Sequence, residues 1–355
     1  MEYLKNAAVY GSICDIGIEE GKIAFIGKTD EDGTDLCGMR VYPGLVDVHS
    51  HGCIGYDTMD AEDHLREMAE FQLSNGTTTW YPTTMTMSFD DITRAVTRKT
   101  DFENGASIPG FHMEGPFINP KHKGAQSEKH IFKPDYSKIR ELNSVKLVTI
   151  APELPGSRRF IEECPALICL GHSDADYDTA RGAFRAGVRC LTHTFNAMPG
   201  IHHRMPGPIA AAFDTDGIYA QIIADGNHIH ESVLRMIIRI LGEERIVLIS
   251  DSMRATGMED GEYTLGGEAV FVKGGVARCE DGRLAGSTST LLDCVRYLAA
   301  HGISADSAFR MASEVPARMM GLNKGKIEVG YDADLIAVDN DNNLVKVMKN
   351  GRFYK

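Results

Sequence analysis

Eight apolar, β-rich segments follow one another along the middle of this chain, and stretches with a helical pattern separate most of them. The segments cover residues 41–51, 77–84, 107–115, 145–153, 166–173, 188–198, 218–226 and 245–252. Nearly continuous apolar strands that alternate with helices are typical of a parallel sheet covered on both faces. Eight such β/α units predict a TIM barrel, and a doubly wound open sheet is the alternative that the pattern leaves open.

Two of the intervening stretches, residues 61–76 and 173–187, carry clear helix-like patterns. In the second stretch we expect Ser173 or Asp174 to be the N-cap, because such side chains accept a hydrogen bond from the N–H groups of the first turn. Gly187 is expected to end this helix, since glycine readily adopts the backbone conformation that follows a helix.

Both ends of the chain have a different residue pattern from the middle. Residues 1–42 and 322–355 alternate apolar and polar residues, with glycine or aspartate between the runs. This pattern predicts short strands joined by turns. The two ends are therefore expected to pair as one small β-domain, with the barrel over residues 43–321. A further β-like piece at about residues 259–283 is expected to form a β-hairpin inserted after the eighth strand.

The composition narrows the possible partners. With 355 residues and 43% hydrophobic content, the chain can bury a large core in one or two domains. A formal net charge of −13 argues against nucleic acid or an anionic membrane as the main partner. No signal peptide is recognisable, and no apolar run approaches the ~20 residues of a membrane span. The eight cysteines form no C-x-x-C pair, so reduced thiols in a cytoplasmic protein are expected.

Ionisable residues gather at the carboxyl ends of the predicted strands. In a TIM barrel these ends form the face that carries the active site. Six of the eight segments contribute to the set, which consists of Asp47, His49, His51, His112, Glu114, His172, His193, Asp225, His228 and Asp251. We therefore expect one site at the mouth of the barrel.

The first of these groups contains two histidines, His49 and His51. They lie two residues apart, so on a strand their side chains point to the same side. Taken alone, the pair fits two interpretations equally well: a metal site, or two polar residues at the end of a strand. Glu114, His172 and His193 change this, because four histidines and one carboxylate form a ligand set suited to Zn²⁺ or Fe²⁺. Barrel-mouth histidines satisfied by hydrogen bonds are the alternative.

Asp251 ends the eighth segment. Strands one and eight are neighbours once a barrel closes, so Asp251 is expected beside His49 and His51. A carboxylate next to a metal-activated water can accept its proton and later deliver that proton to a leaving group. We therefore predict that Asp251 is the catalytic acid and base, with a helix cap or a structural metal ligand as the alternatives.

Several of these motifs together resemble a known family. The segments include "VYPGLVDVHSHG", "GFHMEGPFINPKHKGAQ", "THTFNAMPGIHHRMPG", "IADGNHIH" and "LISDSMRATGM", and they occur in the family's order. The chain resembles the amidohydrolase superfamily and, within it, the N-acetylglucosamine-6-phosphate deacetylases. The P-G-x-x-D-x-H-x-H-G motif marks only the superfamily, whereas H-x-E-G-P-F with H-x-x-N-A-M is specific to the deacetylases. The resemblance covers nearly the whole chain.

The resemblance implies a (β/α)₈ barrel, a small β-sandwich domain built from both termini, and a homodimer. It implies that Glu114, His172 and His193 hold one divalent metal. Because the chain keeps both His49 and His51, the resemblance also allows a second metal, bridged by Glu114. One or two ions per subunit are therefore expected.

The resemblance also implies a set of substrate contacts. Arg204 and His228 match the family's phosphate ligands, and one or both are expected to reach the site of the partner subunit. The backbone around Asn196 and Ala197 is a further candidate phosphate contact. Gln126 stands where many relatives carry a histidine that contacts the acetyl carbonyl. His112 and Asp47 are expected to support the site rather than to bind metal or substrate.

The implied activity is hydrolysis of the acetamide of N-acetylglucosamine 6-phosphate to glucosamine 6-phosphate and acetate. One alternative is another amidohydrolase, such as a cyclic-amide hydrolase, a deaminase or an enzyme for a related N-acetylhexosamine phosphate. Another is a metal-binding or sugar-phosphate-binding protein without catalytic activity. Neither the metal nor the preferred sugar epimer follows from the sequence.

Overall fold

The structure is a computed structural model that describes residues 1–354. Its central sheet has eight parallel strands in the order β15-β14-β13-β12-β11-β10-β9-β6. The strands are β6 (Leu45–Ser50), β9 (Thr77–Thr84), β10 (Phe111–Glu114), β11 (Val145–Ile150), β12 (Leu167–Leu170), β13 (Cys190–Leu191), β14 (Tyr219–Ile223) and β15 (Ile246–Ile249). Each strand lies beside its predecessor in the chain. This order confirms the predicted barrel, because a doubly wound sheet reverses its strand order at a switch point.

The barrel closes where β6 meets β15. Just beyond these strands, the Asp251 N–H donates to the His49 carbonyl at 2.9 Å, and the His51 N–H donates to the Ser252 carbonyl at 2.8 Å. The seam therefore joins the first and last strands at the residues that the sequence marks as functional.

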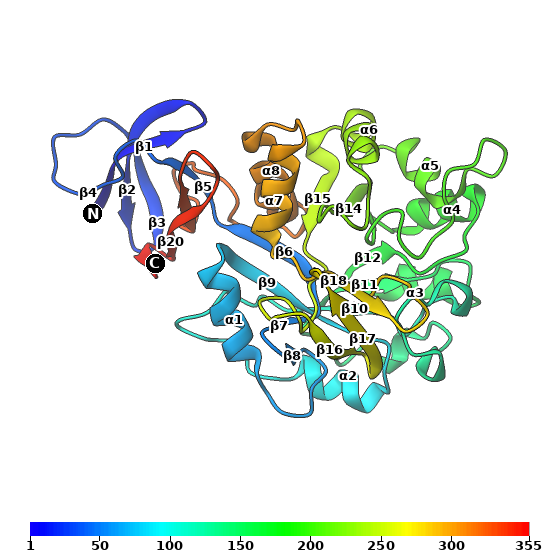
Figure 1. The fold of residues 1–355 in the computed structure, drawn as a ribbon. Helices are drawn as coiled ribbons and strands as arrows, with labels where there is room; N and C mark the ends of the chain where they lie inside the picture. The colour runs from blue at the N-terminus through cyan, green and yellow to red at the C-terminus, as the bar shows by residue number, and fades with distance from the viewer. Residues whose placement is uncertain (355) are drawn as a thin grey trace.

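Helices cover the outside of the barrel, as Figure 1 shows. They are α1 (Leu65–Ser74), α2 (Phe89–Val96), α3 (Ser157–Glu163), α4 (Tyr177–Ala186), α5 (Gly207–Phe213), α6 (Glu231–Leu241), α7 (Leu291–Ala300), α8 (Ala305–Ala312) and α9 (Glu314–Met319). The connection from β10 to β11 has only the 3₁₀ turns η1 (Pro120–His122), η2 (Glu128–His130) and η3 (Tyr136–Lys138). A fourth such turn, η4 (Glu243–Arg245), precedes β15. None of the helices in residues 1–354 is long and apolar enough to span a membrane.

The start of α4 differs from the prediction. Neither Ser173 nor Asp174 caps the helix. The Ser173 hydroxyl donates to the Glu153 carboxylate at 2.7 Å, and the Asp174 carboxylate pairs with Lys121 and His122 at 2.7 and 2.9 Å. The N-cap is Asp176, whose side chain accepts the backbone N–H three residues further on. The helix ends at Gly187 as predicted.

The two ends of the chain meet in a second sheet, which Figure 1 shows with both termini beside it. Its order is β21-β20-β19-β5-β1-β2-β3, and β4 pairs with β1. The strands are β1 (Glu2–Val9), β2 (Ser12–Glu19), β3 (Lys22–Gly27), β4 (Thr34–Asp35), β5 (Arg40–Pro43), β19 (Leu335–Val338), β20 (Leu344–Lys349) and β21 (Arg352–Phe353). The antiparallel β5–β19 pair joins the amino-terminal and carboxyl-terminal strands. One apolar cluster, with Leu4, Ile16 and Leu335, belongs to this sheet, and another, with Val46, Leu147 and Val247, belongs to the barrel strands. The largest cluster contains residues of both parts.

The segment after β15 forms a small antiparallel sheet. It has three strands, β16 (Gly261–Leu265), β17 (Glu268–Lys273) and β18 (Val276–Cys279), where a two-stranded hairpin was expected. A short pair, β7 (Gly52–Cys53) and β8 (Tyr56–Asp57), follows β6. Residues from the three-stranded insertion and from the chain that follows it border the barrel mouth.

Candidate metal centre and active site

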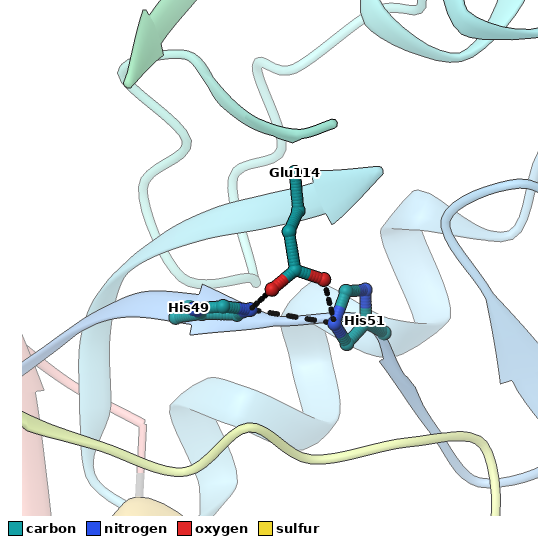
Figure 2. A group of neighbouring side chains, drawn as sticks. All are labelled: His49, His51 and Glu114. Atoms are coloured by element: carbon teal, nitrogen blue, oxygen red, sulfur yellow. Dashed lines mark hydrogen bonds and ion pairs between the residues drawn. The ribbon is translucent and has the colours of Figure 1, made fainter. Parts of the chain in front are cut away.

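The centre of the site is Glu114, whose carboxylate faces both histidines from the first strand. Figure 2 shows one carboxylate oxygen directed at His49 and the other at His51. The His49 Nε2 lies 3.4 Å from Glu114 Oε1, and the His51 Nε2 lies 3.3 Å from Oε2. The two Nε2 atoms are 3.4 Å apart, and all three residues are buried. The two-residue spacing thus turns both imidazoles to the same side.

His172 and His193 also face the Glu114 carboxylate. Their Nε2 atoms lie 3.1 and 2.9 Å from Glu114 Oε1 and 3.0 Å from each other. Both follow strand ends and have positive φ angles, 48° and 25°, and Asp251 also has a φ of 48°. Residues other than glycine adopt such angles at a cost in free energy, and these outliers concentrate at functional sites.

Contacts behind the centre set the proton positions of three of the imidazoles. Each of their Nδ1 atoms faces an oxygen that can only accept a hydrogen bond, so in the neutral imidazole Nδ1 carries the proton and the Nε2 lone pair faces the centre. The pairs are His49 with Gln221 Oε1 at 3.0 Å, His51 with the Thr83 carbonyl at 3.3 Å, and His172 with the His122 carbonyl at 2.8 Å.

These distances fit a divalent metal. Ligand atoms about 2.0–2.1 Å from a tetrahedral ion lie about 3.3–3.4 Å from one another. The set of His49, His51 and Glu114 has separations of 3.3–3.4 Å. The set of Glu114, His172 and His193 is slightly tighter, at 2.9–3.1 Å. The chain therefore has two three-residue groups that could each hold a metal ion, and they share Glu114. We call these groups the two ligand sets.

The charges at the centre also favour a cation. Burial raises the pKa of Glu114, but the surrounding imidazoles, His49 foremost, bring it well below its usual range. Burial likewise raises the pKa of Asp251, but His49 and His51 lower it by more, so the pKa lies below its usual value. Burial lowers the pKa of His51, while hydrogen bonds with Asp251 and Glu114 raise it well above its usual value. Two carboxylates thus stay ionised in a buried site.

Asp251 lies between the metal centre and the open pocket. Its Oδ1 is 3.5 Å from the His49 Nε2 and 3.4 Å from the His51 Nε2. The residue lines the pocket, although only 7% of its surface is exposed. A carboxylate at this point lies beside His49 and His51 and at the wall of the pocket.

His112 and Asp47 support the site from behind. Both ring nitrogens of His112 have protein partners, the Val48 carbonyl at 3.0 Å and the Thr149 hydroxyl at 2.8 Å, so neither remains for a metal. Asp47 accepts the Ser250 hydroxyl at 2.5 Å across the barrel seam. Burial is the main reason that the pKa of Asp47 rises to about 6.

A pocket of about 620 Å³ opens over the centre. Gln126, Asn196, Ala197 and His228 line it, as does Asp251, so the structure brings most of the predicted substrate residues together. The volume lies within the usual range for small-molecule sites.

His228 is paired with Asp225 at the pocket wall. Its Nδ1 lies 2.8 Å from Asp225 Oδ2. Burial lowers the pKa of His228, but the hydrogen bond and the charge of Asp225 raise it to a net increase. Burial raises the pKa of Asp225, and His228 brings it down to about 2. Asp225 therefore favours an imidazolium at the pocket.

Arg204 is the predicted substrate residue that does not line this pocket. It lies exposed between β13 and α5, and its guanidinium donates to the His203 ring at 2.8 Å. Within one chain, Arg204 is therefore not placed in its own active site.

Gln126 contacts the metal centre directly. Its amide oxygen accepts the Thr86 N–H at 2.6 Å, and its amide nitrogen donates to Glu114 Oε2. Because the oxygen is held by Thr86, the NH₂ group points at the centre. One of its two hydrogens is used by Glu114, and the other remains for a ligand.

Sequence reasoning missed several residues of the site. His122 lines the pocket and orients His172 through its carbonyl. Leu284 and Gly286 also line the pocket, from the chain after the insertion. Gln221 is buried behind His49, and its one visible signal was a polar residue inside the apolar run of β14.

A barrel that carries its ligand histidines and carboxylates at the carboxyl ends of the strands defines a metal-dependent hydrolase. The chain belongs to the amidohydrolase family, whose model matches residues 40–354. It is 35% identical to the N-acetylglucosamine-6-phosphate deacetylase of Lysinibacillus sphaericus, over 98% of this chain and 95% of that protein. It is also 35% identical to the N-acetylgalactosamine-6-phosphate deacetylase of Escherichia coli O157:H7, over 91% of this chain and 89% of that protein.

A solved structure is similar over nearly the whole chain. It is a mutant of the Mycobacterium smegmatis N-acetyl-D-glucosamine-6-phosphate deacetylase in complex with N-acetyl-D-glucosamine-6-phosphate. The TM-score is 0.94 at 32% sequence identity, and the match covers 99% of both chains. The similarity thus includes the terminal sheet as well as the barrel.

Proposed function

We propose that this chain hydrolyses the acetamide of N-acetylglucosamine 6-phosphate and releases glucosamine 6-phosphate and acetate. The observation that carries the proposal is the shared pocket, which joins Asp251 and the two ligand sets to Asn196, Ala197 and His228. The near full-length similarity to deacetylases of this substrate supports it.

For the cofactor we propose Zn²⁺ or Fe²⁺, one or two ions per subunit. Glu114, His172 and His193 would hold one ion, and His49 and His51 would hold a second with Glu114 between them. Mixed imidazole and carboxylate ligands suit both metals. When bound, such an ion lowers the pKa of a water molecule and polarises a carbonyl group.

In the proposed reaction Asp251 would carry out the proton transfers, and Gln126 would donate a hydrogen bond to the acetyl carbonyl. The Asp251 carboxylate accepts a proton from the attacking water as the water oxygen bonds to the acetyl carbon. Asp251 returns this proton to the amine nitrogen as the carbon–nitrogen bond breaks. The free N–H of Gln126 donates to the carbonyl oxygen as negative charge develops there, a contribution of a few kcal/mol for a well-placed donor, roughly 2.7–4.

The far end of the sugar would be held through its phosphate. His228, whose cationic form the Asp225 carboxylate favours, supplies one donor, and the backbone at Asn196 and Ala197 supplies further contacts. A guanidinium binds two phosphate oxygens in parallel, so we assign Arg204 to the phosphate as well. Binding of the phosphate would hold the sugar in place and so orient its amide at the reacting centre.

Because Arg204 lies outside its own pocket, we propose a homodimer in which it enters the partner's site. Ile201 and Met205, on either side of it, are 46% and 71% exposed. Exposed apolar side chains beside a functional arginine support a surface that a second subunit covers. We also propose a cytoplasmic location, which the eight free cysteines support.

A second candidate substrate is N-acetylgalactosamine 6-phosphate. The chain is as similar to the Escherichia coli O157:H7 deacetylase of that sugar as to the Lysinibacillus sphaericus enzyme, at 35% identity to each. The two sugars differ in the configuration of a single hydroxyl, and the ligand sets and Asp251 would serve both.

The test is acetate release from both sugar phosphates and from their unphosphorylated forms, with metal content measured on the same preparation. We expect hydrolysis of one or both phosphorylated sugars and a kcat/KM at least tenfold lower without the phosphate. Equal rates with and without phosphate would refute the phosphate site. Absence of acetate release from a metal-loaded preparation would refute the deacetylase proposal.

A further inference from the structure

Gln221 is a fully buried amide in the middle of the barrel that none of the proposed chemical steps uses. It lies on β14, and its backbone carbonyl accepts the Thr194 N–H at 2.8 Å. Its side-chain oxygen accepts the His49 Nδ1–H at 3.0 Å and the His193 backbone N–H at 3.4 Å. The amide nitrogen has only a long contact, 3.9 Å, to the Cys169 sulfur.

Apart from the two histidines, the neighbours of Gln221 are apolar. Its amide nitrogen faces the Cys169 sulfur, and Val247 is its partner on β15; both are fully buried. An amide in such a place costs free energy unless its hydrogen bonds are made. The strongest bond that the Gln221 side chain makes is the one to His49, so a role toward His49 explains its presence.

His49 differs from the other ligand histidines in the kind of partner that it has. His51 and His172 donate from Nδ1 to backbone carbonyls, which no side-chain substitution removes. His193 Nδ1 has no partner within residues 1–354. His49 is thus the one ligand of this centre whose described Nδ1 contact is a side chain, that of Gln221.

We propose that Gln221 is a positioning residue that decides whether the second metal set forms. Its oxygen holds the proton of His49 on Nδ1 and so leaves the Nε2 lone pair facing Glu114 and His51. The same oxygen ties His49 to the backbone of His193, which belongs to the other set. The inference rests on the proposed two-metal centre but not on the identity of the substrate.

The effect of losing Gln221 is unequal for the two sets. Without the acceptor, His49 can carry its proton on Nε2 or rotate its ring, and either change removes a ligand from the set with His51. The ring contacts of Glu114, His172 and His193 with one another do not involve Gln221. Loss of a partner behind a ligand typically weakens metal binding ~10–100-fold.

The experiment compares wild type with Gln221→Met and Gln221→Glu. Methionine keeps the length and apolar fit but gives the imidazole only a weak acceptor, whereas glutamate keeps a carboxylate oxygen for the Nδ1–H. Each full-length protein is stripped with a chelator and titrated with Zn²⁺, and the bound metal is counted by elemental analysis. Gln221→Leu is the second variant if methionine prevents folding, as judged by thermal unfolding.

We expect two Zn²⁺ per wild-type subunit and a second-site Kd that rises ~10–100-fold in Gln221→Met. The first-site Kd should rise less, because in that set Gln221 contacts only the backbone N–H of His193, at 3.4 Å. Gln221→Glu should bind both ions with nearly wild-type affinity. Equal affinities in Gln221→Met and wild type, or a single ion in wild type at saturating Zn²⁺, would overturn the inference. Acetate release by the same wild-type preparation reports on the proposed function independently.

Discussion

Replacing Asp251 by asparagine is the sharpest test of the proposed chemistry. Asparagine keeps the shape of the side chain but cannot take up a proton at neutral pH. Of the residues that line the pocket, only Glu114 and Asp251 carry carboxylates. Glu114 is held by four imidazoles and by Gln126, so it is not free to replace the lost base.

The expected magnitude follows from the two proton transfers that we propose for Asp251. General acid–base catalysis by one group typically contributes about 10²–10⁴ in rate, or about 3–5 kcal/mol in the barrier. Because Asp251 acts as base and then as acid, we expect kcat to fall toward the upper end, by at least about 10³-fold. KM should change little, since no predicted phosphate contact involves Asp251.

The assay measures kcat and KM for acetate release together with metal content. Asp251 is in contact with His49 and His51, whereas Glu114, His172 and His193 contact one another without it. At least one metal ion per subunit should therefore remain in the variant. A variant with that metal and more than about a tenth of the wild-type kcat would refute the assignment, since so small a loss is below the usual effect of a general base.

Three further outcomes follow from the structure. Arg204→Ala should raise KM for the phosphorylated sugar by about 10–100-fold, as expected for loss of a charged hydrogen bond, and leave the slow reaction of the unphosphorylated sugar unchanged. The raised pKa of His228 means that its charge is present at low pH and lost as pH rises through that pKa, so KM should rise with pH in wild type. In His228→Gln that rise should be absent from a pH series of initial rates. Phe309→Ala should lower the free energy of unfolding by about 3–5 kcal/mol in urea titrations, because the ring is fully buried and stacked on Tyr42 at 3.9 Å. A loss below about 1 kcal/mol would contradict that packing argument.

The strand pattern carried most of the fold prediction. Apolar runs with polar residues at their ends are a local signal, and parallel strands bring their carboxyl ends to one face. His49 and His51 follow from the two-residue repeat of a strand, and Glu114 follows from its place at the end of β10. The barrel predicted from the eight segments was enough to indicate that these side chains would lie close together.

Details that depend on distant partners were beyond the sequence. The helix α4 starts at Asp176 rather than earlier, because Glu153 holds the Ser173 hydroxyl and Lys121 and His122 hold the Asp174 carboxylate. The extra strand of the insertion likewise depends on which neighbours pair, and short β-like runs do not specify this.

The sequence alone therefore determined the class of fold, the face that carries the site and the chemistry of its ligand atoms. Only the tertiary structure decided how those atoms are held. Gln221 contacts His49 although 172 residues separate them, and Gln126 turns its amide to Glu114 because Thr86 binds its oxygen. Such contacts join strands and loops that are remote in the chain, and no local pattern of residue types records a hydrogen bond between them.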